Sequence, residues 1–217
     1  MNTQHTETNL SSDSIYYRPL EKSDYKSVAD LLTTVWGFDQ VASKWNARQM
    51  AYVFLHDLLH VATFSSVAVQ NDTIVGIVLG RSKADSQPPK LFNLKKQFHH
   101  FLLLFNQEGK EAALSFKRQK QVNEGLYSQT KRAFEGKLQL LAVNPSARKS
   151  GIGTHLYHSF IDYMNEKQAA NFYLFADNRL SYEFFEKKQL KREAIITRKM
   201  PFFNQTLTFY LYSKDLL

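Results

Sequence analysis

One segment, residues 137–167, constrains the fold of this chain more than any other. An apolar run at 138–143 has the length of a strand, and an amphipathic helical pattern follows from about 151 to 167. A further apolar run at 172–176 again has strand length. Two strands joined through a helix form a β-α-β unit, whose strands are parallel and whose crossover is right-handed. The sequence therefore predicts an α/β core.

The connection between this strand and helix has the composition of a phosphate-binding loop. It reads Asn144-Pro-Ser-Ala-Arg-Lys-Ser-Gly-Ile-Gly-Thr154. Gly151 and Gly153 fall where the helix begins, and the unpaired N–H groups of a first helical turn attract anionic oxygens. Arg148 and Lys149 add positive charge at the rim. An ordinary glycine-containing turn has the same composition, so the loop alone leaves both interpretations open.

Two widespread phosphate-binding loops do not match this one. A Walker A loop places its lysine directly after the second glycine, whereas Lys149 precedes both glycines. The dinucleotide fingerprint has a third glycine where this chain has Leu156. The remaining pattern is Arg148, two residues, Gly151, one residue and Gly153. It resembles the pyrophosphate motif of the GNAT superfamily of N-acetyltransferases.

The order of the expected elements also resembles the GNAT fold. A strand at 15–20, two amphipathic helical patterns and a hairpin that turns at 71–72 precede the β-α-β unit. A short helix at 181–188 and two further strands follow it. A weaker match to the family lies in Asn178, Ser181, Phe184 and Phe185.

The resemblance implies an α/β fold of the α+β type, with a central mixed, mostly antiparallel sheet flanked by helices. A single GNAT domain is expected over residues 15–217, preceded by a flexible tail at 1–14. The segment at about 82–136 has two or three helical stripes and is expected to be a helical insertion between the third and fourth strands.

The resemblance also implies a cofactor and the residues that bind it. Acetyl-CoA, as the acyl donor, would lie in the splay between the strands 138–143 and 172–176, at their carboxyl ends. Backbone groups of the first strand would pair with its pantetheine arm, and the N–H groups of the motif loop would hold its pyrophosphate. The expected cofactor-binding residues are Leu141, Val143, Arg148, Lys149, Ser150, Gly151, Ile152, Gly153, Thr154 and Asn178.

The expected reaction is acetyl transfer to a primary amine of a small molecule or peptide. Such an amine must be neutral to attack, although a lysine-like amine has a pKa of about 10.4. No general base stands out, because Gln139 is the one polar side chain of the strand 138–143. The family's usual general acid is a tyrosine, and this chain has Phe185 at the matching position. Tyr182, one helical turn earlier, is expected to protonate the departing thiolate instead.

The acceptor amine is expected to contact the loop between the first two helices. Trp36, Phe38 and Asp39 lie on that loop, and an aromatic wall with one carboxylate suits a cationic amine with an apolar body. Simple packing of the loop is the alternative interpretation.

The net charge of +8 favours acidic partners, and much of it lies in the segment 82–136. This segment is interpreted as a solvated surface, as a lid or dimerisation element, or as a contact for nucleic acid or an acidic partner. A lid or homodimer contact is favoured, because a phenylalanine-rich stripe needs a cover; nucleic acid is not. The stripe comprises Leu91, Leu94, Phe98, Phe101 and Phe105.

Several functional classes find no support. The chain has no cysteine, which excludes disulfides, thiolate metal sites and a cysteine nucleophile. His56 and His60 have the spacing of a zinc peptidase helix, but Asp57 replaces the required glutamate and no third ligand is recognisable, so no metal is expected. No apolar run approaches the roughly 18 residues of a membrane span, and the start lacks a secretory signal. A cytoplasmic protein that does not bind membranes is expected.

One alternative function stays open at this point. A GNAT-like scaffold that holds a CoA ligand or nucleic acid, without transferring a group, would also explain the motif. Phe185 in place of the usual tyrosine and the missing general base both keep this binding module in consideration.

Overall fold

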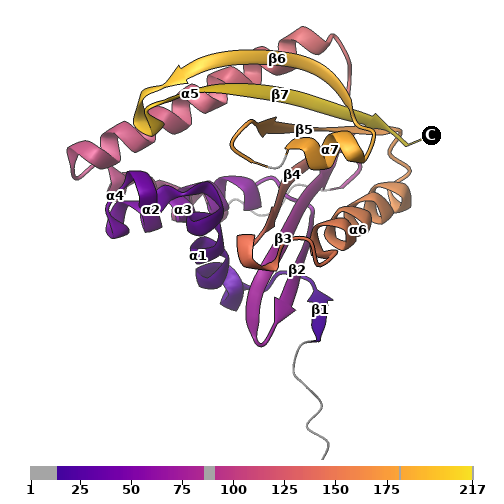
Figure 1. Cartoon of the computed structure of the whole chain (residues 1–217), viewed down its shortest axis with the longest axis horizontal. Coiled ribbons are helices and arrows are strands. Elements are labelled where there is room, and N and C mark those ends of the chain that lie inside the picture. Colours follow the sequence, from indigo (N-terminus) through magenta and orange to yellow (C-terminus); the bar gives the residue numbers. More distant parts are fainter. Residues whose placement is uncertain (1–13, 86–90, 181, 217) are drawn as a thin grey trace, which may run out of the picture.

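The structure is a computed structural model that describes residues 14–85, 91–180 and 182–216. Within these residues, seven strands form one sheet in the order β1-β2-β3-β4-β5-β7-β6 (Figure 1). They are β1 (Ile15–Arg18), β2 (Phe64–Gln70), β3 (Thr73–Ser82), β4 (Gly136–Val143), β5 (Asn171–Asp177), β6 (Lys191–Met200) and β7 (Gln205–Asp215). All neighbouring strands are antiparallel except β4 and β5, which are parallel. The predicted mixed, mostly antiparallel sheet is therefore confirmed. The predicted tail lies outside the described residues, apart from residue 14.

Helices cover both faces of this sheet. They are α1 (Tyr25–Trp36), α2 (Phe38–Val41), α3 (Lys44–Leu59), α4 (Leu91–Leu103), α5 (Gln107–Thr130), α6 (Ile152–Glu166) and α7 (Tyr182–Lys187). Ile77 and Leu79 of β3 pack with α1 and α3, whereas Val78 packs with α6. Because successive strand residues point to opposite faces, α1 and α3 lie on one face and α6 on the other (Figure 1). No helix in the described ranges is both long and apolar enough to cross a membrane.

Two helices, α4 and α5, occupy the segment between β3 and β4. Phe134 lies in the loop after α5 and is 1% exposed. Phe98, Phe101 and Phe105 stay on the surface, with exposed fractions of 58%, 59% and 67%. The interpretation of this segment as an insertion that forms a lid or a homodimer contact stays a prediction.

An irregularity in the pairing of β3 with β4 changes which face the residues of β4 point to. Leu79 pairs with Leu140 and Gly80 with Leu138, so Gln139 is an extra residue on β4. Such a bulge shifts the alternation of side chains by one position. As a result, Leu138 packs in the cluster around α6, whereas Leu140 packs in the cluster around α1 and α3.

The pairing of β4 with β5 is short. The two strands form a parallel ladder only at Gly136↔Phe172 and Lys137↔Tyr173, and β5 continues along its full length against β7. From Leu138 onward, therefore, the edge of β4 that faces β5 carries no ladder. The sheet is open at the carboxyl ends of its two parallel strands, which is where ligands of open α/β sheets bind.

Helix α5 is held at its start by a cluster of hydrogen bonds to the beginning of α3. The side chain of Asn106 caps α5 by accepting from the Gly109 N–H at 2.8 Å. The carboxylate of Glu108 accepts from the N–H and the hydroxyl of Ser43, each at 2.7 Å, and from the side-chain amide of Asn46. These bonds lower the pKa of Glu108, so its carboxylate is charged in the folded protein.

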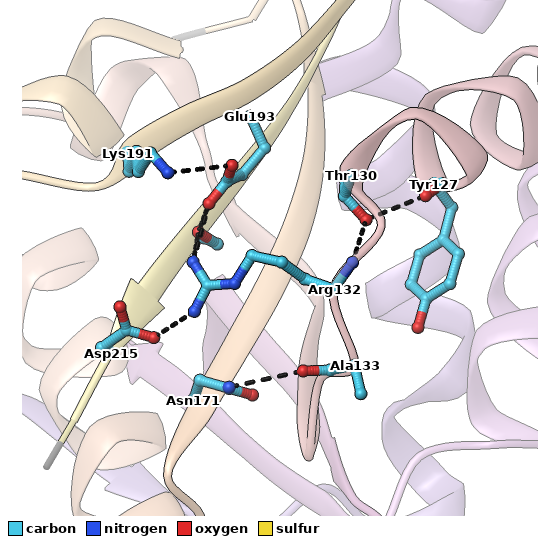
Figure 2. Close-up of polar contacts among 9 residues, drawn as sticks. Tyr127, Thr130, Arg132, Ala133, Asn171, Lys191, Glu193 and Asp215 are labelled. Carbon is cyan, nitrogen blue, oxygen red and sulfur yellow. Dashed lines mark hydrogen bonds and ion pairs between the residues drawn. The ribbon is translucent and has the colours of Figure 1, made fainter.

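The end of α5 is held by a second cluster, which joins its following loop to β6 and β7 (Figure 2). Arg132 donates to Glu193 of β6 at 2.8 Å and to Asp215 of β7 at 2.5 Å. Lys191 forms an ion pair with the same Glu193 at 3.2 Å. Anchored at both ends, α5 spans the face of the sheet on which α3 also packs.

The Glu193 carboxylate is expected to stabilise the fold in a pH-dependent way. Burial raises its pKa, but hydrogen bonds from Ser213, Arg132 and Lys191 outweigh burial, and the pKa lies below its usual value. Its stabilisation is therefore present above the unfolded-state pKa and is lost as pH falls through the folded-state value. Glu193→Gln should lower the free energy of unfolding by about 1–3 kcal/mol at pH 7 and by less near pH 3, measured by urea denaturation.

The control for this prediction is Glu166→Gln, because the Glu166 side chain is 74% exposed beside Lys167. It should leave the unfolding free energy unchanged at both pH values. Equal losses for Glu193→Gln at pH 7 and pH 3 would contradict the assigned role of its charge.

Candidate active site

A cavity of about 540 Å³ opens where β4 and β5 diverge, and we call it the loop cleft. Its walls come from β4, the loop 144–151, the first turn of α6, β5 and α7. The loop leaves β4 in a fixed direction, because the Asn144 N–H donates to the Val75 carbonyl at 2.8 Å. The Asn144 side chain then accepts from the Ser146 N–H at 3.1 Å and begins a short 3-10 turn, Pro145–Ala147.

The first turn of α6 presents its N–H groups without a capping side chain. Gly151 is the N-cap residue in a left-handed conformation, with φ of 87°, and no side chain bonds to this helix end. A Cβ atom built on Gly151 would meet no atom within 4 Å, so the space in front of the turn is open. The turn contains no acidic residue. The geometry is that of an anion-binding helix start.

The charged side chains around the loop cleft also favour an anionic ligand. The cationic side chains that line it are Arg148, Lys149 and Lys187, and the one lining carboxylate in the described residues is Glu183. The Arg148 side chain lies back along the loop, where its Nε donates to the Val143 carbonyl at 3.4 Å. Cations beside free N–H groups favour a phosphate-bearing ligand.

The structure brings most of the predicted cofactor-binding residues together in the loop cleft. Those that line it are Leu141, Val143, Arg148, Lys149, Gly151, Gly153 and Thr154. The Ser150 hydroxyl instead donates to the Ala147 carbonyl at 2.7 Å, and the Ile152 side chain is buried in the core. Asn178 lies outside the lining, since its side-chain oxygen accepts from the Thr208 N–H at 3.0 Å.

The predicted general acid also lies at the loop cleft. Tyr182 and Phe185, both on α7, line it, and the Tyr182 ring packs 5.1 Å from the Tyr210 ring. Sequence reasoning did not include Leu180, Glu183 or Lys187, which line the cleft from the same region. The sequence signal for this side of the cleft was the helical pattern at 181–188, because it closely follows the second strand of the β-α-β unit.

The three predicted acceptor residues are separated in the structure. Trp36 lines the loop cleft, where its ring lies 5.1 Å from that of Phe54. Phe38 is 2% exposed and packs in the core against Phe54 and Phe116. Asp39 is exposed and does not line this cleft.

A second cavity of about 800 Å³ lies on the face of the sheet that α3 and α5 cover, and we call it the helix-side pocket. Its floor includes Lys137, Tyr173 and Phe175 of β4 and β5, and α3 and α5 form its walls. Gln139 and Phe175 line both cavities. The loop cleft and the helix-side pocket are therefore neighbours at these two residues, beside the bulge of β4, and we call this place the junction.

Lys137 is the unusual group on the floor of the helix-side pocket. Its Nζ lies 4.9 Å from the ring centre of Phe175 and 5.6 Å from that of Tyr173. Burial lowers the pKa of Lys137 to about 8, although the charge of Asp57 acts in the opposite direction. A lysine within an otherwise apolar strand was a sequence signal for this pocket, and sequence reasoning did not use it.

Comparison with known proteins identifies the family of this chain. The model of the Acetyltransferase (GNAT) family matches residues 26–189. The chain belongs to the GNAT acetyltransferase family. This match confirms the resemblance that the Arg148, Gly151 and Gly153 motif indicated. A search of curated proteins found no relative by sequence.

Solved structures share the GNAT fold with this chain. Protein smu.2055 from Streptococcus mutans UA159 has 18% identity and a TM-score of 0.55, with 93% of this chain and 99% of that chain covered. PH1933 from Pyrococcus horikoshii OT3 has 15% identity and a TM-score of 0.57, covering 94% and 100%. Protein yncA from Salmonella typhimurium, solved with its cofactor acetyl-CoA, has 13% identity and a TM-score of 0.52, covering 94% of each chain. Identities this low establish the shared fold alone.

Of the two histidines considered as metal ligands, His56 lies in α3 and belongs to the packing of the GNAT domain, and His60 is the residue that ends this helix. His56 is 3% exposed, and its ring packs against those of Tyr25, Tyr52 and His99. Over residues 14–85, 91–180 and 182–216, no group of three or more His, Cys, Asp or Glu side chains is arranged to hold a metal ion.

The two motif glycines are expected to respond differently to substitution. Gly151→Ala places a Cβ in the left-handed region and should lower the free energy of unfolding by about 1–2 kcal/mol. Gly153→Ala is the matched control, because its Cβ would lie 3.6 Å from Val143 and 3.9 Å from Phe184, at ordinary contact distances. It should leave stability unchanged or slightly higher. Urea denaturation measures both, and equal effects would contradict the assigned backbone strain.

Proposed function

We propose that this protein is an N-acetyltransferase that transfers the acetyl group of acetyl-CoA to a primary amine of a small molecule or peptide. The observation that carries the proposal is the junction of the two cavities at Gln139 and Phe175. A transferase must bring a donor and an acceptor together at one point. Here a cleft suited to a polyphosphate and a separate aromatic pocket share two lining residues beside the gap between β4 and β5.

The donor half of this proposal rests on the chemistry of the loop cleft. The N–H groups of the loop 149–154, with Arg148, are suited to the pyrophosphate of acetyl-CoA. Beyond Lys137, β4 has no ladder partner in β5, so backbone groups of Leu141 and Val143 face the cleft edge. A pantetheine arm that carries amide groups would complete this unpaired strand edge with hydrogen bonds.

The acceptor would approach from the helix-side pocket. Its amine nitrogen would form a bond to the thioester carbonyl carbon, and the carbon–sulfur bond would break to release the CoA thiolate. A backbone N–H of β4 near the bulge would stabilise the negative charge that develops on the carbonyl oxygen. The Tyr182 hydroxyl, on the cleft side, would donate its proton to the departing sulfur, while the amine nitrogen would lose a proton to water, from which the tyrosinate would be reprotonated.

The donor site is tested first by titrating the purified protein with acetyl-CoA in a calorimeter. The wild type should bind, and Arg148→Glu should bind at least about tenfold more weakly, because it reverses a charge beside the proposed pyrophosphate site. Lys26→Glu on α1 is the matched control, since Lys26 is exposed and lines neither cavity. Failure of the wild type to bind even at millimolar acetyl-CoA would contradict the donor site.

Turnover distinguishes an enzyme from a CoA-binding module without transferase activity. Tyr182→Phe removes only the proposed proton donor and should lower kcat about 10–100-fold, with acetyl-CoA affinity unchanged. Tyr210→Phe alters the ring that packs against Tyr182 and should retain turnover. The measurement is acetylation of a panel of primary amines. Unchanged kcat in Tyr182→Phe would remove Tyr182 from the mechanism.

A further inference from the structure

Two cationic side chains lie directly opposite each other on the sheet that forms the floor of the helix-side pocket. Arg81 of β3 and Lys137 of β4 form a cross-strand pair, and both line the pocket. Directly opposed residues of an antiparallel pair point to the same face with neighbouring Cβ atoms, and like charges in this arrangement are destabilising. The Arg81 charge indeed contributes to the lowered pKa of Lys137, after the larger effect of burial.

No described carboxylate forms an ion pair with either cation. In residues 14–85, 91–180 and 182–216, Arg81 and Lys137 have no partner within the 4.0 Å limit of an ion pair. The described carboxylates that line the pocket are Asp57, Glu124 and Glu135. Glu135 accepts from the Ala170 N–H at 2.6 Å, and Glu124 lies 3.9 Å from Lys120. Asp57 raises the pKa of Lys137 without offsetting the effect of burial.

The remaining charges of the pocket add to this excess of positive charge. Its described lining contains five Lys or Arg side chains and three carboxylates, a difference of two positive charges. The cations are Arg81, Lys83, Lys117, Lys120 and Lys137. His100 and Tyr127 also line it, and burial raises the pKa of the floor residue Tyr173 to about 12, so that phenol is neutral. A pocket whose floor carries two neighbouring cations, neither of them in an ion pair within the described residues, is complementary to an anion.

The position of the cation pair relative to the junction sets the shape of the ligand. Lys137 is two residues before Gln139 on β4, which corresponds to about 7 Å along a strand. The floor between them includes Phe175, which lies at the junction and under the Lys137 ammonium. A ligand with its amine at the junction and an anionic group at the cation pair would therefore lay a flat or apolar body over Phe175.

We infer that the acceptor is an amine that also carries an anionic group, a carboxylate or a phosphate, which binds between Arg81 and Lys137. This inference rests on the proposed acetyltransferase function and names the class of its acceptor. The anion would supply the countercharge that the pair lacks, and the aromatic floor would hold the body that joins the two ends.

The test compares matched amines as acceptors. 4-(Aminomethyl)benzoate and 4-(aminomethyl)phenylphosphonate carry the anion at about the required span, and benzylamine lacks it. The wild type should prefer the better anionic amine to benzylamine by about 10–100-fold in kcat/KM. Comparison of the carboxylate with the phosphonate identifies which anion the pair selects. Arg81→Gln and Lys137→Met should each lower the preference at least about tenfold, through a higher KM for the anionic amine.

The control variants are Arg48→Gln and Lys26→Met, whose side chains are exposed and line neither cavity. They should retain the preference of the wild type. Equal kcat/KM for benzylamine and both anionic amines, or an unchanged preference in both Arg81→Gln and Lys137→Met, would overturn the inference and leave the acetyltransferase function standing.

A binding measurement keeps the inference testable without turnover. Each variant is titrated by calorimetry with acetyl-CoA, to establish that the donor cleft is intact, and with 4-(aminomethyl)benzoate and the phosphonate in the presence of CoA. Saturable binding of either anionic amine by the wild type, weakened at least about tenfold in Arg81→Gln and Lys137→Met, supports the anion site even if no amine is acetylated. No binding of either compound at millimolar concentration overturns it.

Discussion

The rest of the site depends on the short parallel contact between β4 and β5. Two residue pairs hold these strands together, and beyond Lys137 and Tyr173 they separate while β3 and β7 keep pairing with their outer edges. A strand edge inside a sheet normally has its N–H and C=O groups paired. Beyond Lys137, the edge of β4 that faces β5 has no ladder partner, so the middle of the sheet contains a strand edge to which a ligand can bind. Both cavities exist because this gap lies between well-paired neighbours that cannot close it.

The bulge at Gln139 determines how the two faces share this gap. Because one extra residue shifts the alternation of β4, Lys137 points to the α3 and α5 face while Leu141 packs toward α6. Without the bulge, Lys137 and Leu141 would point to the same face of the sheet. Helix α5 covers the face to which Lys137 points, and its two anchors, at Glu108 and at Arg132, hold it across the pocket; Figure 2 shows the anchor at Arg132.

Electrostatics is organised differently on the two sides of the opening. On the loop side, positive character comes from backbone N–H groups and exposed side chains such as Arg148, which water screens in the absence of a ligand. On the helix side it comes from Arg81 and the half-buried Lys137, whose ammonium lies over two aromatic rings and is poorly hydrated. Burial makes the second arrangement costly to keep unpaired. That cost is the physical reason to expect an anion at this position.

The sequence by itself determined the order of the elements, the glycine-containing helix start at Gly151 and the membership of the GNAT family, because these depend on local periodicity and on residues within one short loop. Only the tertiary structure decided which side chains share a cavity. Phe38 is buried in the core, and the Asn178 side chain accepts a hydrogen bond from the Thr208 N–H. Neither residue lines the loop cleft, although each was expected to contact a ligand. Lys137 and Arg81 are 56 positions apart in the numbering and meet only through strand pairing. Contacts of this kind depend on register and on one bulge, which no local pattern in the chain encodes.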